Sequence, residues 1–376
     1  EIEGIHEPKD AEKKADLGKT IFDKLENLPL TKIAVINGAC LGGGFELALA
    51  CDYRVAGFEK SIKIGLPEIR LGILPGFGGC VRLPQVIGLS NALELILAGK
   101  MLDPQRALRK GLVDALFYDS ILLSEAIKWT RGRIGKKPRR PTGKRPPIMK
   151  LLESNNWGRS IIYKQARKNV LKTTKGHYPA PITALETIEK LYTENHLRAS
   201  KIESRGFAEL AGTDVSRNLI KVFYLDEAYK KRSWTEHAQS FVPRKAGVLG
   251  AGVMGGGIAQ LIVSKEIPVR LKDINYQSLG LAFKTADKVH RYLIKRRRIT
   301  RADALRQNTL ISPTLDYRGF ERVDVVVEAV VEKMEIKKQV FAELDKVLSP
   351  DALLLTNTSS LPVGEMASVT NRPDKV

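Results

Sequence analysis

Hydrophobic and polar positions follow two different periods within residues 1–130. Leu17, Ile21 and Leu25 recur at helical spacing, whereas residues 32–38 form a short β-branched run that is typical of a strand. Alternation of helix and strand patterns predicts an α/β domain. Because the first strand follows a helix, we expect the opening strands of this domain to precede the first residue.

Glycines and turn residues punctuate the same region. A glycine triplet precedes residues 45–56, and Ser90 is an N-cap candidate for residues 90–100, so we expect both segments to be helices. Residues 65–79 are rich in glycine and proline, which predicts turns.

The pattern changes in residues 131–243. Residues 131–147 contain four prolines and no acidic residue, which predicts an extended, solvated connector between two folded units. Residues 148–236 show mostly helical periodicity and no strand pattern. We therefore expect a basic, mostly helical linker.

From residue 244 to the end, strand and helix patterns alternate again. Apolar runs predict strands in residues 245–250, 269–274, 323–330 and 352–359, with helical patterns between them. This order predicts a parallel sheet of the Rossmann type with right-handed crossovers.

Composition narrows the possible partners. The chain has 376 residues, with 62 Lys and Arg against 42 Asp and Glu, giving a net charge of +20, and residues 131–243 hold 24 of the basic residues and 10 of the acidic ones. Such a charge suits nucleic acid, a membrane surface or a polyanionic small molecule. Aromatic residues are not interleaved with the basic runs, which disfavours recognition of single-stranded nucleic acid. The basic run at residues 291–301 could be a patch for nucleic acid or anionic lipid, but it is read as a solvated face.

Cysteine usage and the chain start bear on location. Cys40, Cys51 and Cys80 are odd in number and form no C-x-x-C pair, so we expect a reducing, cytoplasmic environment. The sequence shows no secretory signal and no apolar run of about eighteen residues, which predicts no transmembrane segment. The first residue is Glu1 rather than Met, which suggests a processed or truncated chain.

A dinucleotide fingerprint begins the third region. Gly250, Gly252 and Gly255 follow a predicted strand and open a helix, where they permit a tight turn, close approach of a pyrophosphate and helix–strand packing. Asp273 ends the next strand, where a carboxylate accepts the ribose hydroxyls and repels a 2′-phosphate. The spacing favours NAD over NADP; the alternative is a glycine turn that binds nothing.

Two glutamates form the candidate site of the first region. Gly43 lies at the start of a predicted helix, where its N–H group can stabilise an anion. Glu46 follows in the first helical turn, and Glu68 lies among apolar residues in the turn-rich segment. Two buried glutamates facing one pocket would separate in pKa and serve as acid and base for adding water. The alternative is that Glu46 caps its helix and Glu68 is a surface turn residue.

The chain resembles two families, one in each outer region. Residues 37–56 and 64–84 resemble the enoyl-CoA hydratase/isomerase (crotonase) family, and residues 247–260, 326–345 and 357–363 resemble 3-hydroxyacyl-CoA dehydrogenase. In this order they are similar to the multifunctional α-subunits of fatty-acid β-oxidation complexes. The resemblance implies a partial crotonase-like domain, a helical linker and a partial Rossmann domain.

The resemblance also implies chemistry: hydration of trans-2-enoyl-CoA to L-3-hydroxyacyl-CoA, followed by NAD-dependent oxidation to 3-oxoacyl-CoA. It makes Glu46 and Glu68 the residues that hold and activate water, and the N–H of Gly43 an oxyanion donor. It implies acyl-CoA thioester substrates and an oligomeric complex with a thiolase β-subunit as candidate partner, without nucleic acid.

For the third region the resemblance implies an NAD site and substrate contacts. Ser359 matches a serine that hydrogen-bonds the substrate 3-hydroxyl, and Asp226 matches a substrate-contacting acid, although a solvated helix charge is the alternative. The positions that match the NAD site are Met254, Asp273, Val330, Val331, Glu332, Lys337, Asn357 and Ser359.

Departures from both families predict impaired activity in this chain. The second oxyanion loop of the hydratases and the catalytic histidine segment of the dehydrogenases are not visible, and the 22 positions from Glu46 to Glu68 exceed the expected spacing slightly. A rival hypothesis is therefore a non-catalytic NAD-binding scaffold or subunit. The histidines present lie in polar contexts that favour the surface over catalysis: His6, His177, His196, His237 and His290.

Overall fold

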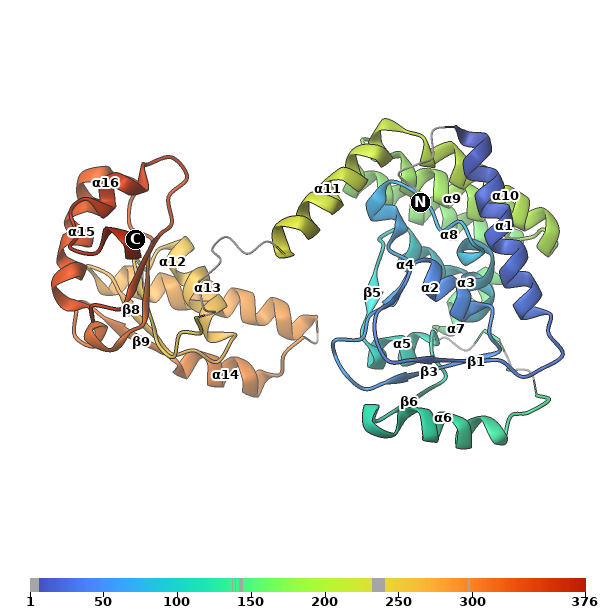
Figure 1. The fold of residues 1–376 in the computed structure, drawn as a ribbon, viewed down its shortest axis with the longest axis horizontal. Coiled ribbons are helices and arrows are strands. Elements are labelled where there is room, and N and C mark those ends of the chain that lie inside the picture. Colours follow the sequence, from blue (N-terminus) through green and yellow to red (C-terminus); the bar gives the residue numbers. More distant parts are fainter. Residues whose placement is uncertain (1–6, 137, 139, 142–144, 232–240, 297) are drawn as a thin grey trace. The chain divides into compact units, whose positions relative to one another are not determined.

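The computed structural model describes residues 7–136, 138, 140–141, 145–231, 241–296 and 298–376. The chain divides into two compact units, Glu1–Trp234 and Thr235–Val376, and each is described by itself (Figure 1). Among the described residues, no helix is both long and apolar enough to cross a membrane.

The first unit combines short strands with many helices. Its strands are β1 (Ile33–Ile36), β2 (Cys40–Leu41), β3 (Tyr53–Gly57), β4 (Ile64–Gly65), β5 (Met101–Leu102) and β6 (Ala115–Phe117). Its helices are α1 (Pro8–Glu26), α2 (Gly43–Leu49), α3 (Gly79–Ile87), α4 (Leu89–Ile96), α5 (Pro104–Lys110), α6 (Leu122–Arg131), α7 (Pro147–Glu153), α8 (Asn156–Thr174), α9 (Pro179–Leu191), α10 (His196–Ala211) and α11 (Asp214–Lys231), with 3₁₀ turns η1 (Glu68–Leu71) and η2 (Asp119–Ile121).

Two small sheets organise this unit. Strands β1, β3 and β6 pair in parallel in that order, and β4 pairs in parallel with β2 and antiparallel with β5. The expected helix at residues 45–56 is wrong in its second half, because α2 ends at Leu49 and β3 follows. Tyr53 and Val55 are buried between two neighbouring strands, and this pairing overrides the helical propensity of the segment.

Helix α1 buries a side made mainly of small residues. Leu17 and Ile21 are exposed, whereas Ala11, Ala15 and Lys19 are buried. Helices α1 and α10 pack against each other, and the small alanine side chains permit this close approach. The helix predicted from the spacing of Leu17, Ile21 and Leu25 is confirmed, and its buried side is formed by two alanines and Lys19.

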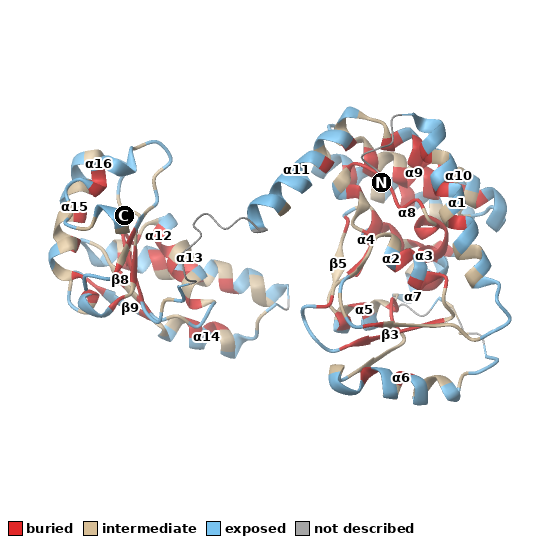
Figure 2. Ribbon diagram, viewed as in Figure 1, coloured by how far each residue is buried: buried red, intermediate tan, exposed pale blue. Residues whose placement is uncertain are grey.

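The basic middle region belongs to the first unit. The helices expected in residues 148–236 are confirmed as α7 to α11 for the part that the structure describes. Ile162, Leu185 and Phe207 lie in the same hydrophobic core as Leu74. Figure 2 shows buried segments in α9 and α10. These helices pack on the α/β region of the first unit.

The proline-rich segment before these helices was expected to be extended and solvated. Among its described residues, Arg140 contacts the Asp114 carboxylate at 2.8 Å and is mostly buried, and Arg145 pairs with Glu153. Ion pairs therefore hold these described residues against the first unit and neutralise part of their positive charge. At these positions the segment is not fully solvated.

The second unit is an open parallel sheet with helices. Its elements are β7 (Ala246–Leu249), α12 (Val253–Val263), β8 (Val269–Lys272), α13 (Tyr276–Lys295), α14 (Arg301–Thr309), β9 (Ile311–Thr314), η3 (Phe320–Arg322), β10 (Val325–Glu328), α15 (Met334–Val347), β11 (Leu353–Thr356), α16 (Val363–Ala367) and η4 (Pro373–Lys375). The strand order is β11-β10-β7-β8-β9, all parallel.

Both faces of this sheet are covered. Val325 belongs to one hydrophobic cluster with α12 and α13, and its neighbour Val326 belongs to another with α15. Successive strand residues point to opposite faces, so helices pack on each side. The predicted Rossmann-type parallel sheet is confirmed, with β9 as an additional strand that the sequence pattern did not reveal.

Candidate functional site

The start of α2 is shaped by glycine. Gly42 has φ +57°, a left-handed conformation that glycine adopts readily. A Cβ atom at this position would also lie 3.3 Å from Glu68 Oε1. The chain can therefore pass close to the Glu68 carboxyl group and begin α2 at Gly43 beside it.

Glu46 is almost completely buried in the first turn of α2, at 2% exposure. Its Oε1 accepts hydrogen bonds from the N–H groups of Phe77 and Gly79, each at 2.8 Å. The alternative that Glu46 caps its own helix is therefore wrong, because its carboxylate accepts from N–H groups before and at the start of α3.

Glu68 reaches the same place from η1. Both of its carboxyl oxygens are buried, and neither has a hydrogen-bond partner among the described residues. A buried acceptor without a partner is costly to fold, so it marks a position where another molecule can supply the missing bond. The alternative of a surface turn residue does not fit this burial.

The two carboxyl groups are electrostatically linked. Burial raises the pKa of Glu46 well above its ordinary value, and the charges of Glu68 and Glu203 raise it further, against the two N–H donors. Burial also raises the pKa of Glu68 to about 7. At neutral pH the pair therefore does not hold two full negative charges.

Glu203, on α10, is a third buried carboxylate that sequence reasoning missed. It is 0% exposed, and its Oε1 accepts from the N–H of Cys80 at 2.8 Å. Lys19 Nζ lies 3.7 Å from its Oε2. Burial raises the pKa of Glu203, while the charge of Lys19 lowers it. The apolar neighbours Ala199 and Phe207, four residues away on either side, are the signal that could have placed this acid on the buried face.

Phe77 lies over the start of α2. A Cβ atom on Gly43 would come within 3.3 Å of the Phe77 ring, and one on Gly18 would come within 2.6 Å. The ring also meets Phe22 edge-on, with centroids 5.9 Å apart. One aromatic side chain thus fills the space between α1 and the glycine triplet.

In the second unit the glycine turn has the geometry that its fingerprint predicts. Gly250 has φ +89°, and a Cβ atom there would lie 2.4 Å from the carbonyl oxygen of Ala329. A Cβ atom on Gly255 would lie 1.6 Å from the carbonyl oxygen of Gly250, whereas one on Gly252 would meet nothing within 4 Å. The turn packs tightly on its own unit and leaves Gly252, the N-cap of α12, open for an anion.

Asp273 lies directly beyond β8 and next to this turn. Its Oδ2 accepts from the N–H of Ala251 at 2.6 Å, and its Oδ1 accepts from the N–H of Ile274 at 2.6 Å. The sequence-predicted carboxylate and glycine turn therefore meet, as a dinucleotide site of this type requires.

A buried ion pair lies at the carboxyl end of β10, the strand next to β7 in the sheet. Lys337 Nζ contacts Glu328 Oε1 at 2.8 Å and Oε2 at 2.9 Å, and both residues are 0% exposed. Glu328 also accepts from the N–H of Val330 at 2.6 Å and from the hydroxyl of Thr356 at 2.7 Å. Lys337 thus lies beneath the surface that the resemblance assigns to NAD. Sequence reasoning did not identify Glu328 as a functional or structural residue. The signal that could have found it is an acidic residue at the end of an apolar strand.

The remaining expected residues of the NAD site lie near the solvent. Glu332 Oε2 contacts Lys337 at 3.3 Å, and its Oε1 accepts from the N–H of Ser359 at 3.3 Å. Val330 is half-buried. Exposed residues complete the set: Met254, Val331, Glu332, Asn357 and Ser359.

The expected substrate contact Asp226 lies on α11. Its carboxylate is exposed and pairs with Lys230 at 2.5 Å, so its surroundings match the solvated helix charge that was the alternative.

The histidines differ from the expectation at one position. His290 is completely buried between α13 and α14, where its Nε2 lies 3.1 Å from Gln307 Oε1. The expectation that it lies on the surface was wrong, because the inner face of α13 covers it. His177 is exposed, and His6 and His237 lie outside the described residues.

Asp23, Glu26 and His196 bring their ligand atoms together at the surface of the first unit. Arg82 already contacts both carboxylates, with Nη2 2.9 Å from Glu26 Oε2. This guanidinium occupies both carboxylates and offsets one of their two charges, and nothing else among the described residues of the site points to a metal.

Comparison with known proteins defines the class. The family model described as enoyl-CoA hydratase/isomerase matches residues 3–141, and that described as 3-hydroxyacyl-CoA dehydrogenase, NAD binding domain matches residues 245–376. The first unit therefore contains a crotonase-like region, and the second is an NAD-binding Rossmann domain of the 3-hydroxyacyl-CoA dehydrogenase type. The expected fold class and cofactor are confirmed.

Curated relatives carry both regions in one chain. Fatty acid oxidation complex subunit alpha of Shewanella amazonensis is 40% identical over 364 residues, which is 96% of this chain and 51% of the relative. The same subunit of Shewanella sp. strain ANA-3 is 38% identical over 370 residues, covering 98% and 52%. The chain is a homologue of this subunit and spans about half the length of the curated relatives it matches.

A solved structure also matches. The crystal structure of (S)-3-hydroxybutyryl-CoA dehydrogenase from Ralstonia eutropha is 29% identical and covers 36% of this chain and 47% of its own, with a TM-score of 0.35. That score is too low to bear on function.

Proposed function

We propose that the first unit adds water across the double bond of a trans-2-enoyl-CoA thioester. The observation that carries this proposal is the pair of buried carboxyl groups, Glu46 and Glu68, beside the start of α2. The water oxygen bonds to the β-carbon, and a proton is delivered to the α-carbon. With a pKa of about 7 and unpartnered oxygens, Glu68 is suited to exchange the proton, while the fixed Glu46 orients the water.

The thioester oxygen gains negative charge during this addition. The N–H groups of Gly43 and Gly44 stand in the first turn of α2, where a helix supplies no internal acceptor, and the positive end of the helix dipole lies behind them. They are the groups of this chain best suited to stabilise the enolate.

Hydration of crotonyl-CoA tests the proposal. Glu46→Gln and Glu68→Gln should each lower kcat by roughly 10²–10⁴, since each removes one proton-transfer or water-orienting group. Glu59→Gln, an exposed glutamate in the loop between β3 and β4, is the matched control and should keep the parent rate. Full activity in both site variants would exclude this mechanism.

We further propose that the second unit oxidises the resulting L-3-hydroxyacyl-CoA. Gly250, Gly252 and Asp273 would hold NAD, which supplies a hydride acceptor when bound. Ser359 would donate to or accept from the substrate hydroxyl. Calorimetric titration with NAD, with Asp273→Ala expected to weaken binding about tenfold or more, tests the binding step. Heat from NAD binding without NADH formation would favour the scaffold hypothesis over oxidation.

The name of the relatives supports a proposal about partners. As a homologue of a fatty acid oxidation complex subunit alpha, this chain would act in an oligomeric complex in the cytoplasm, with a thiolase β-subunit as partner. Co-purification of the full-length protein with its β-subunit tests this, and elution of the two as separate species would contradict it.

A further inference from the structure

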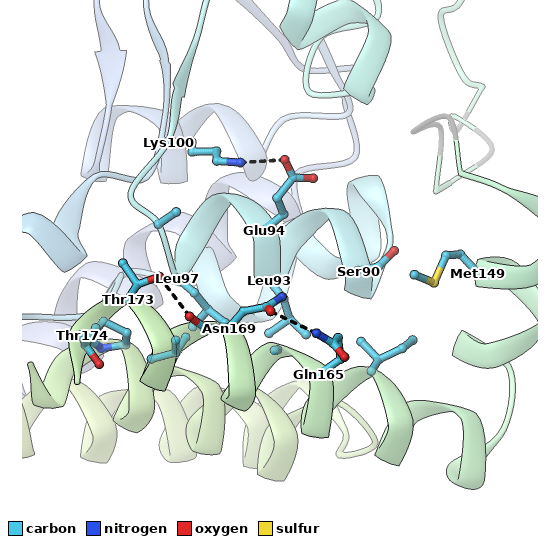
Figure 3. Close-up of a pocket in the computed structure, with 15 residues that line it drawn as sticks. Ser90, Leu93, Glu94, Leu97, Lys100, Met149, Gln165, Asn169, Thr173 and Thr174 are labelled. Carbon is cyan, nitrogen blue, oxygen red and sulfur yellow. Dashed lines mark hydrogen bonds and ion pairs between the residues drawn. The ribbon is translucent and has the colours of Figure 1, made fainter. Parts of the chain in front are cut away.

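Helices α4 and α8 of the first unit enclose a cavity of about 370 Å³ (Figure 3). The α8 residues that line it follow the i, i+3, i+4 spacing of one helix face over about 17 Å: Ile162, Gln165, Ala166, Asn169, Val170 and Thr173. Two helix faces thus oppose each other along several turns without filling the space between them.

The walls of the cavity are mainly apolar. Leu93 and Leu97 contribute from α4, and Ile162 and Val170 contribute from α8. Ala166 is too small to close the gap between the helices. Pockets of this volume with apolar walls and a few polar groups are typical of small-molecule sites.

A cluster of three charged groups stands at one end of the cavity, where Glu94 and Lys100 line it and Lys110 lies outside the lining, against Glu94. Lys100 Nζ contacts Glu94 Oε1 at 2.8 Å, and Lys110 Nζ contacts Glu94 Oε2 at 2.6 Å (Figure 3 shows the first pair). Burial raises the pKa of Glu94, but the hydrogen bonds from both lysines outweigh it and leave the pKa below the ordinary value. Two ammonium groups therefore share one carboxylate, and one positive charge remains uncompensated within this group of three.

This cavity is separate from the glutamate site. The groups that bond Glu46 are the N–H groups of Phe77 and Gly79, and the groups around Glu203 are Cys80 and Lys19. None of these lines the cavity. Occupation of the cavity is therefore a different event from hydration.

We propose that the cavity binds a fatty acid, with its chain between α4 and α8 and its carboxylate at Lys100. An apolar slot that ends at Lys100, in a cluster of two lysines and one glutamate with a net charge of +1, matches an unbranched chain that ends in one negative charge. The proposal does not depend on the hydratase function, and each can fail without the other.

Calorimetric titration with decanoate tests the site. Decanoate should bind the parent chain, and Lys100→Gln should weaken it about tenfold or more, because a charge-assisted hydrogen bond is lost. Lys164→Gln, on the exposed side of α8 and outside the cavity, is the matched control and should bind as the parent does. Decanol, which has no charge, should bind Lys100→Gln and the parent equally.

A second variant tests the apolar walls. Ala166→Phe places a ring in the cavity and should abolish decanoate binding while the circular dichroism spectrum and crotonyl-CoA hydration stay unchanged. If this variant fails to fold, the Lys100→Gln comparison decides alone. Absence of heat with decanoate, or equal binding of decanoate by the parent and Lys100→Gln, would overturn the proposal.

Discussion

Glu203 in the first unit and Glu328 in the second are both completely buried, yet their surroundings differ. Glu328 has a lysine ammonium in contact with both of its oxygens, at 2.8 and 2.9 Å, and two further donors. Glu203 has its cation, Lys19, at 3.7 Å and shares its surroundings with two other carboxyl groups.

The difference distinguishes a buried carboxylate that stabilises the fold from one that can exchange a proton. A buried carboxylate that is fully paired has a fixed protonation state and positions the backbone around it. Buried carboxylates that crowd together favour the protonated form and exchange protons near neutral pH, which is what acid–base chemistry requires. Burial alone therefore does not identify the site; the number and distance of the partners do.

The largest effect should follow from unpairing the charge in the second unit. Lys337→Met leaves Glu328 buried without its cation and should lower the free energy of unfolding of this unit by about 3–5 kcal/mol. Hydrogen exchange of the β10 amides under mild urea measures this unit specifically. Combining the change with Glu328→Leu should restore most of the loss, since it removes the stranded charge.

The neighbouring residue supplies the control for that prediction. Lys338 pairs with Glu365 at 3.1 Å and is partly exposed. Lys338→Met should cost less than about 1 kcal/mol, because solvent screens an exposed pair. Equal losses for the two lysine variants would contradict the assignment of Glu328 as a stabilised internal charge.

The next effect concerns pH in the first unit. Glu68 has a folded-state pKa of about 7 against an ordinary value of 4.5. Between these two pH values the folded protein holds a proton that the unfolded chain releases, so stability falls as pH rises, by about 3 kcal/mol in total. Glu68→Gln lacks this loss and should gain stability relative to the parent between pH 5 and pH 8.

Urea unfolding at several pH values, read from hydrogen exchange of β3 amides, measures the difference. Glu59→Gln should run parallel to the parent across the same range, since this side chain is exposed. If the stability of Glu68→Gln varied with pH in parallel with that of the parent, the pKa of the Glu68 carboxyl group would not be raised in the folded protein.

A smaller effect is expected at the cation of the glutamate cluster. Lys19 bonds the Ser200 carbonyl and the Ser204 hydroxyl and lies near Glu203. Lys19→Met should cost about 1–3 kcal/mol at pH 8 and less at pH 5, because Glu203 can take up a proton in place of its cation. If Lys19→Met lowered the free energy of unfolding as much as Lys337→Met does, and equally at both pH values, Glu203 and Glu328 would not differ in how they are stabilised.

Sequence reasoning recovered the elements with strong local patterns. The strands beginning at Ala246 and Val325 stand out as β-branched runs, and both are confirmed. Strand β9 was missed because its sequence, residues 311–314, contains a proline and two polar residues, and its pairing with β8 supplies what the local pattern lacks. Strand β3 was missed because its partner strands, β1 and β6, are distant in sequence, so that no local pattern reveals the pairing.

The site residues likewise divide into those visible from the local sequence and those defined by long-range contacts. Glu46 and Glu68 were visible as acids in apolar surroundings, and the glycine turn and Asp273 were visible from their spacing. Glu203 bonds an amide 123 positions away, and no local pattern encodes that contact. Long-range partners determine whether a buried acid is neutralised, so they also determine which acids take part in chemistry.

The smallest effect should come from the exposed cluster around Asp23. His196 Nε2 lies 2.9 Å from Asp23 Oδ1, but both side chains are partly exposed, at 46% and 30%. His196→Asn should therefore change the free energy of unfolding by less than about 1 kcal/mol, while Arg82 keeps its contacts with both carboxylates. Added Zn²⁺ should not raise the melting temperature, because the Arg82 guanidinium already contacts both carboxylates and its positive charge repels a metal ion. A loss above about 2 kcal/mol, or stabilisation by Zn²⁺, would mean that proximity of charges matters more than their burial in this unit.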